Sequence, residues 1–205
     1  YDGLAIASTI LNSKEQQSGA IIVDFGGTAT KVSFFKRHNI YRSLVIPIGS
    51  DSITKDISVC LKVSIPEAER LKILYGNIHL AVVNPDEDLD ISTEEGPKKI
   101  KVQLLSQIIE SRVREIFLFC LKHFPALSEE QYPVVFSGGG ALLKGFLPFC
   151  KKYINASARD GIRDDIQEML ESSLYAVAVG SIMYGISRNA INYKPSGNRI
   201  LEKYK

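Results

Sequence analysis

Two glycine-rich segments, each directly after an apolar run, hold the residue types in this sequence that could do chemistry. The first runs from Asp24 to Thr30 with the spacing D-x-G-x-x-x-T, and the second runs from Ser137 to Ala141. Glycine has no Cβ, so the backbone of such a segment can approach a phosphate or a base closely. Two such loops, each after its own predicted strand, indicate a nucleotide held between two parts of the chain.

The first loop carries groups that suit a triphosphate. The backbone N–H groups from Gly26 through Gly27 and Thr28, together with the Thr30 hydroxyl, could hold the β- and γ-phosphates. The Asp24 carboxylate could hold the water shell of a hydrated Mg²⁺, which contacts few protein groups directly. An ordinary hairpin turn also favours Asp and Gly, so this loop alone leaves both interpretations open.

The second loop suits the adenosine end of a nucleotide. Gly138, Gly139, Gly140 and Ala141 lie between a predicted strand and a predicted helix, where a tight connection would usually need only one glycine. On a separate predicted helix, Glu69 and Lys72 are three residues apart and could flank the ribose and adenine. Without the two loops, a solvated helix face would be the simpler interpretation of that pair.

Composition narrows the class of protein. The chain has 205 residues, 45% of them hydrophobic, and a net charge of +2 without a long run of like charges, which favours a globular protein and disfavours a nucleic-acid partner. Cys60, Cys120 and Cys150 are expected to be buried free thiols, and no His or Cys spacing indicates a metal site. Because no apolar stretch reaches membrane-span length and the chain begins at Tyr1, we expect a soluble fragment of a longer polypeptide.

Local patterns predict an α/β arrangement with an insertion. Strands are expected at 20–23, 31–34 and 40–48, followed by a helix capped by Ser50 or Asp51. A capping box at Ser64 and Glu67 begins a second helix that Gly76 ends. The remaining predicted elements are β-like pieces within 79–101 around a loop at 84–97, a long helix ending near Pro125, a strand at 134–136, a helix at 141–153, and a helix at 174–186 packed tightly against the sheet.

Seven ordered segments carry a family resemblance: 24–27, 46–49, 53–58, 67–72, 108–116, 137–141 and 178–180. In this order they resemble the second half of the FtsA family, actin-like cell-division proteins that link FtsZ filaments to the membrane. The resemblance implies an α/β, actin-like ATPase (ribonuclease-H-like) core with a small inserted α+β subdomain. It divides the chain into subdomain IIA (1–62 and 131–192), subdomain IIB (63–130) and a polar tail (193–205).

The resemblance also implies the ligands. The chain would bind ATP and Mg²⁺, with Asp24 near the metal, and with Glu69, Lys72 and the segment from Gly138 to Ala141 near adenosine. Many relatives have a third glycine and an acidic residue where this chain has Thr28 and Lys31, so we expect binding with weak or no ATPase activity. The family's first lobe, which carries the other phosphate loop, lies outside this chain, so we expect the isolated chain to be inactive.

Partners follow from the same resemblance. Actin-like protofilaments are implied, on the cytoplasmic side of the cell membrane at the division site, with membrane contact made only through parts outside this chain. The C-terminal tail of FtsZ would dock on subdomain IIB, here at Lys98, Lys99, Lys101 and Arg112. The simpler alternative is that Arg112 pairs with a carboxylate on its own helix. Two other functions stay open, a PilM-like adaptor of pilus assembly and a phosphotransferase or chaperone ATPase of the same superfamily.

Overall fold

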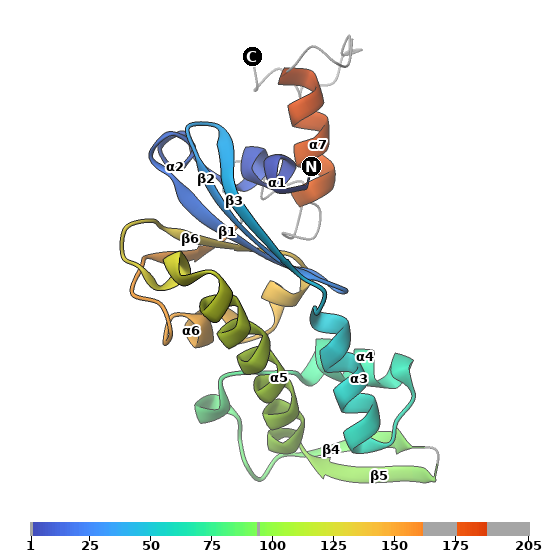
Figure 1. Ribbon diagram of the computed structural model, residues 1–205. Helices are drawn as coiled ribbons and strands as arrows, with labels where there is room; N and C mark the ends of the chain where they lie inside the picture. The colour runs from blue at the N-terminus through green and yellow to red at the C-terminus, as the bar shows by residue number, and fades with distance from the viewer. Residues whose placement is uncertain (1, 94, 162–175, 188–205) are drawn as a thin grey trace.

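The computed structural model describes residues 2–93, 95–161 and 176–187 (Figure 1). The elements in chain order are α1 (Asp2–Ile10), α2 (Ser13–Ser18), β1 (Ala20–Phe25), β2 (Thr30–Lys36), β3 (Asn39–Ile46), α3 (Ser50–Leu61), α4 (Ile65–Tyr75), η1 (Leu80–Val82), β4 (Asp88–Thr93), β5 (Gly96–Lys101), α5 (Val102–His123), η2 (Pro125–Ser128), β6 (Val134–Ser137), η3 (Gly139–Leu142), α6 (Phe146–Cys150), β7 (Ala158–Asp160) and α7 (Ala176–Ser187).

A five-stranded mixed sheet with the order β3-β2-β1-β6-β7 forms the upper half of the molecule (Figure 1). β1, β2 and β3 make an antiparallel meander, and β6 and β7 add to β1 in parallel. All six residues of β1 are buried, because apolar side chains cover both faces of this central strand. The three strands predicted in this part of the chain are thus confirmed, and so is the β6 strand.

Separate apolar layers cover the two faces of the sheet. On one face, Ile6 and Ile10 of α1 pack with Ile22 and Val135. On the other, the larger core includes Phe25 and Phe136 from the sheet together with α5 and α6, and it continues into the lower half of the molecule. The sheet therefore has a small layer on the α1 side and a larger one on the α5 side.

The lower half contains α3, α4, the β4–β5 ribbon and the start of α5 (Figure 1). α3 packs against both α4 and α5. α4 begins at Ser64, whose hydroxyl accepts from the Glu67 amide, has Pro66 in its first turn and ends at Gly76, as predicted. Only half of the expected capping box forms, because the Glu67 carboxylate binds Arg70 instead of the cap backbone.

Several local predictions were wrong. The expected loop at 84–97 instead forms β4 and the start of β5, because Leu89 and Ile91 alternate with exposed residues and pack into the core. Gly49 is the N-cap of α3, without a side-chain cap, and Ser50 is the first helical residue. Cys60 is exposed, whereas Cys120 and Cys150 are buried as expected.

Two predictions near the end of the chain also need correction. The helix expected at 141–153 is broken into η3 and the short α6, with Gly145 between them at φ +81°, a conformation that interrupts a helix. α7 packs chiefly on α1 rather than on the sheet, and a Cβ at Gly180 would lie 1.8 Å from the Ala5 carbonyl oxygen. Leu174, Tyr175 and the tail at 193–205 lie outside the described residues.

Candidate functional site

The first glycine loop is the turn between β1 and β2, and the N-terminus of α3 holds it in place. The carbonyl oxygens of Gly26 and Gly27 accept from the amides of Ser50 (2.9 Å) and Asp51 (2.8 Å). Two N–H groups that a helix start leaves without an internal partner are thereby satisfied. The position of this loop is therefore coupled directly to the position of α3.

Gly49 makes that contact possible. A Cβ at this position would lie 2.3 Å from the Gly27 carbonyl oxygen and 2.5 Å from that of Gly26. Nearby, the buried Thr30 hydroxyl donates to the Ile48 carbonyl oxygen at 2.8 Å, closing β2 against the segment before α3. Thr30 thus has a structural partner, and its contact with a phosphate stays a prediction.

The second glycine loop packs tightly on β1. Gly138 has φ +89°, and a Cβ there would lie 2.5 Å from the Phe25 carbonyl oxygen. A Cβ at Gly140 would lie 2.5 Å from the Phe25 ring. Packing alone therefore explains two of the three consecutive glycines, which weakens the inference that their number requires a ligand. Gly139 lines an open pocket, as does Gly140.

α4 contributes a charged pair linked to α3. Lys72 Nζ lies 2.7 Å from Glu69 Oε2 and donates to Thr54 Oγ1 at 2.9 Å, and the Thr54 hydroxyl donates to Glu69 at 2.5 Å. Lys72 is 5% exposed, so it does not lie on a solvated helix face. Burial alone would raise the pKa of Glu69, but the hydrogen bonds from Lys72 and Thr54 outweigh it and bring that pKa below its usual value.

A pocket of about 450 Å³ lies where these parts meet. Its size falls within the roughly 300–1,000 Å³ typical of small-molecule sites. It brings together one residue of the first loop, the α4 pair and the second loop, and its lining residues are Gly27, Ser50, Asp51, Glu69, Lys72, Ile73, Gly76, Gly139, Gly140, Leu142, Leu143 and Lys144. Five of the residues expected at a nucleotide thus share one cavity.

The other predicted nucleotide-binding residues do not line this pocket. Asp24 is buried at the end of β1 and lines a smaller hollow on the α1 side of the sheet. Gly26, Thr28 and Gly138 belong to the two loops but are not lining residues, and Ala141 lines a second pocket. Sequence reasoning missed Ser50, Asp51 and Thr54, because their contributions depend on how α3 is oriented against α4.

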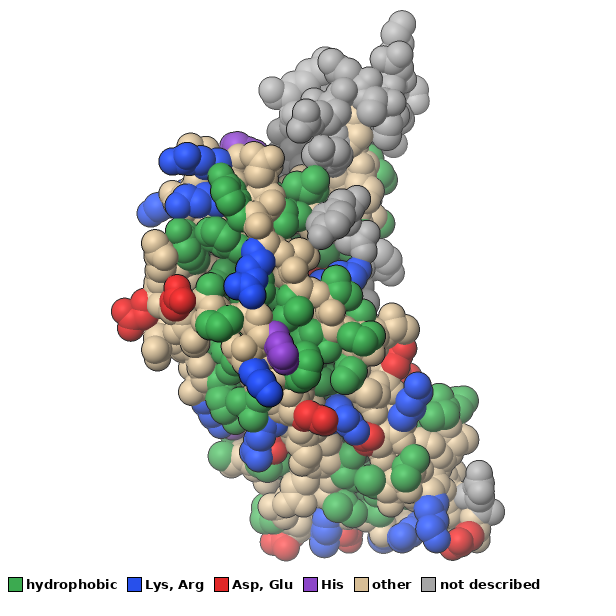
Figure 2. Space-filling view, in the orientation of Figure 1, with side chains coloured by type: hydrophobic (Ala, Val, Ile, Leu, Met, Phe, Trp, Pro, Cys, Tyr) green, Lys and Arg blue, Asp and Glu red, His purple; other side chains and the backbone are tan. Residues whose placement is uncertain are grey.

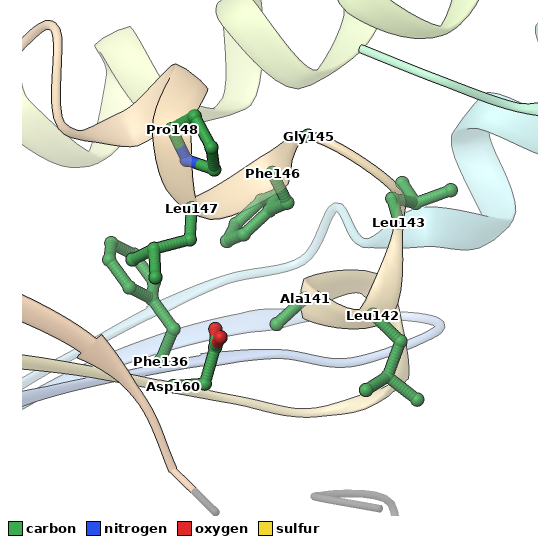
Figure 3. Close-up of a pocket in the computed structure, with 9 residues that line it drawn as sticks. All are labelled: Phe136, Ala141, Leu142, Leu143, Gly145, Phe146, Leu147, Pro148 and Asp160. Atoms are coloured by element: carbon green, nitrogen blue, oxygen red, sulfur yellow. The ribbon is translucent and has the colours of Figure 1, made fainter. Parts of the chain in front are cut away.

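The second pocket, of about 280 Å³, shares Leu142 and Leu143 with the first (Figure 3). Apolar side chains from β6, η3 and α6 surround it, and the Asp160 carboxylate lies among them (Figure 3). Burial raises the pKa of Asp160, and the nearby Lys151 and Arg159 offset part of that effect. The segment from Ala141 to Leu147 therefore has a cavity on each side.

The four cations expected to hold a partner peptide do not share one surface. Arg112 donates to both carboxylate oxygens of Asp56, at 2.5 and 2.9 Å, and to Glu115 at 2.6 Å. Lys101 lies 2.9 Å from Asp88, and Lys99 pairs in register with Asp90.

Strand alternation places Lys98 on the opposite face of β5 from Lys99 and Lys101. Basic and acidic side chains are accordingly mixed at the foot of the molecule (Figure 2). Peptide docking at these residues stays a prediction.

The described residues lack two kinds of feature. Within residues 2–93, 95–161 and 176–187, no cluster of three or more His, Cys, Asp or Glu side chains could hold a metal ion. Across the same ranges, no helix is long and apolar enough to cross a membrane.

Comparison with known proteins gives a consistent result. The family model for the cell division protein FtsA matches residues 21–180. The chain is 25% identical to cell division protein FtsA of Pseudomonas aeruginosa over 195 residues, covering 91% of this chain and 47% of that protein. It is 27% identical to FtsA of Bacillus subtilis over 210 residues, covering 98% and 46%. The chain therefore spans about half the length of the curated relatives it matches.

Solved structures show the fold. MreB5 of Spiroplasma citri bound to ADP superposes with a TM-score of 0.69 at 18% identity, covering 94% of this chain and 61% of that one. The MamK double helical filament gives a TM-score of 0.66 at 12% identity, covering 90% and 58%. The PilM–PilN type IV pilus biogenesis complex gives 0.62 at 14% identity, covering 90% and 52%. The actin-like α/β fold predicted from the sequence is thus confirmed, and the family match favours cell division over pilus assembly.

Proposed function

Because the chain belongs to the FtsA family of actin-like cell division proteins, we propose that it is the second lobe of a division scaffold and binds ATP in the pocket of about 450 Å³. The carrying observation is that both glycine loops and α4 line one cavity. Adenosine would lie against Gly139 and Gly140, with Glu69 beside the ribose, and the phosphates would point toward Gly27. Lys72 would position Glu69 rather than contact adenosine itself, since Lys72 already binds Glu69, Thr54 and the Ser50 carbonyl oxygen.

Asp24 is the group suited to Mg²⁺. Mg²⁺ keeps most of its waters and needs only one or two carboxylates beside the phosphates, so one carboxylate with a neighbouring hydroxyl fits it. Ser137, the register partner of Asp24 on β6, supplies such a hydroxyl, which is buried and has no hydrogen-bond partner among the described residues. When bound, the metal would neutralise phosphate charge, and Asp24 would hold it through water.

The proposed ATP site is half of a cleft. Phosphates held from one side stay largely solvated and poorly positioned, so this chain alone should bind weakly and should not hydrolyse ATP measurably. Nucleotide would regulate assembly rather than support rapid turnover. We infer that the scaffold self-associates into actin-like filaments on the cytoplasmic face of the membrane at the division site, with membrane contact made by parts outside this chain.

The FtsZ C-terminal tail is the proposed partner of the lower half. An acidic peptide would meet Lys99 and Lys101, which are exposed on one face of the β4–β5 ribbon. Arg112 would not contact the peptide directly, because Asp56 and Glu115 already occupy its guanidinium group.

Ligand-observed NMR tests the ATP site, because it detects dissociation constants near 1 mM, equivalent to about −4 kcal/mol. We expect saturable ATP binding in that range and no phosphate release. Gly139→Val should abolish binding without unfolding the chain, because the branched side chain would enter the pocket lined by Gly139. An unchanged affinity in folded Gly139→Val would refute the adenosine assignment, and micromolar affinity with steady turnover would refute the half-site.

A further inference from the structure

Three polar residues form a row across adjacent strands where β1 and β6 end. Asp24 lies directly opposite Lys31 in the antiparallel β1–β2 pair and is the register partner of Ser137 in the parallel β1–β6 pair. Register partners project from the same face of a sheet. Ile22, two residues before Asp24, packs into the core under α1, so the row lies on the α1 face.

Lys31 is close enough to act on Asp24 electrostatically. Side chains directly opposite in an antiparallel pair have Cβ atoms about 4.5–5.5 Å apart. Both residues also line the same hollow of about 170 Å³, together with Gly3 and Ile6 of α1. Asp24 is 8% exposed and Lys31 is half-buried, so water screens the two charges poorly.

Ser137 contributes a buried hydroxyl group to the row. Its side chain is 1% exposed, and its hydroxyl has no hydrogen-bond partner among the residues the structure describes. A buried polar atom without a partner is costly, which favours a bound group that would complete it. The row thus combines a carboxylate, an ammonium group and an unused hydroxyl, next to both glycine loops.

We propose that the positive charge of Lys31 offsets the negative charge of Asp24, a role that Mg²⁺ would otherwise fill. This chain would then bind the phosphates of ATP with little dependence on the metal. An anionic phosphate approaching a buried carboxylate would be repelled unless a cation offset the negative charge. The ammonium group of Lys31 would offset that repulsion whether or not metal is bound. This inference rests on the proposed ATP site and names the residue that sets its metal requirement.

The test compares ATP and AMP binding in MgCl₂ and in EDTA, by ligand-observed NMR up to about 10 mM nucleotide. The variants are Lys31→Met, which keeps the length without the charge, and Lys31→Arg, which keeps the charge. Lys36→Met is the matched control, because it makes the same change at the other end of β2. AMP lacks the terminal phosphates, so its binding reports the adenosine site and the folding of each variant.

For the wild-type chain we expect the ATP dissociation constant to change less than about threefold when EDTA replaces MgCl₂. Lys31→Met should lose at least about tenfold in EDTA but little in MgCl₂, while Lys31→Arg and Lys36→Met should behave like wild type. AMP binding should be the same in all four proteins.

Each other outcome has a definite meaning. If the ratio of the ATP dissociation constants in EDTA and in MgCl₂ were the same for wild type and Lys31→Met, the proposed role of Lys31 would be wrong, while the proposed ATP site would be unaffected. AMP binding by the wild-type chain without ATP binding would also overturn it. Failure of both nucleotides to bind the wild-type chain would overturn the proposed function together with this inference.

Discussion

Replacing Arg112 by alanine should destabilise the chain, because this residue joins two helices. Arg112 on α5 makes two parallel hydrogen bonds to Asp56 on α3, at 2.5 and 2.9 Å. Both side chains are 28% exposed. The Asp56 carboxylate also raises the pKa of Arg112, despite the opposing effect of burial.

The size of the effect lies between two known limits. Exposed ion pairs contribute about 0.2–1 kcal/mol, and buried hydrogen bonds to charged groups about 1.5–3 kcal/mol. A half-buried, two-pronged pair should therefore contribute about 1–2 kcal/mol. For a protein of this size, that corresponds to a fall in Tm of about 2–8 °C. Arg112→Glu should destabilise the chain further, because it places a third carboxylate beside Asp56 and Glu115.

Thermal unfolding followed by circular dichroism measures this change. A double-mutant cycle with Asp56→Ala should give a coupling free energy of about 1 kcal/mol. Arg70→Ala is the matched control: Arg70 makes the same two-pronged contact with Glu67, at 2.7 Å for both bonds, but within a single helix and with its own side chain 43% exposed. It should leave Tm unchanged. A wild-type Tm for Arg112→Ala, or no coupling to Asp56, would refute the view that this pair holds α3 against α5.

Three further predictions follow from local contacts. Gly49→Ala should cost about 1–3 kcal/mol in urea unfolding, because its Cβ would press on the first loop, and an unchanged midpoint would contradict the close approach. Glu69→Gln should lower Tm at neutral pH but lose its effect as the pH falls below 4.5, the ordinary pKa of a glutamate side chain, because a carboxyl group whose pKa is lowered by folding stabilises the fold only while it is ionised. A difference in Tm between wild type and Glu69→Gln that does not change with pH would exclude the charged contact. A chromogenic disulfide reagent should label Cys60 in the native chain, but Cys120 and Cys150 only after unfolding. Burial suppresses thiolate formation and raises the pKa of Cys120 to about 12. Labelling of Cys120 in the native chain would show that α5 opens.

Elements with strong local signals could be predicted from the sequence. β1 is a continuous apolar run that ends at a D-x-G turn, and α4 has Ser64, Pro66 and Gly76 at the positions where a helix begins and ends. The helix after the second loop could not be predicted in the same way. Gly145 breaks it where the chain passes His79, and a Cβ at Gly145 would lie 2.8 Å from the His79 amide nitrogen. That neighbour is distant in the sequence, so no local pattern reports it.

The candidate site also combines features that local sequence patterns indicate with features that depend on residues distant in the sequence. Its two glycine loops are visible in the sequence because each follows a buried strand, but the sequence cannot tell which of these glycines are needed for packing against Phe25. The structure places Gly138 and Gly140 against Phe25. Likewise Arg112 looked available to a partner, because Asp56, its main acceptor, lies on a different helix.

The position of β1 in the sheet has a consequence for how the chain folds. β1 pairs with β2 across a short turn, but its other neighbour, β6, arrives only after the whole segment that carries α3, α4, the ribbon and α5, so that Ile21 pairs with Val134. Closing a loop of that length costs about 4 kcal/mol of chain entropy before the parallel strands gain any contact. The β1–β3 meander can form early from local contacts, whereas docking of β6 requires the inserted segment to be compact. The second glycine loop follows β6, so the pocket is completed only after β6 has docked on β1 during folding.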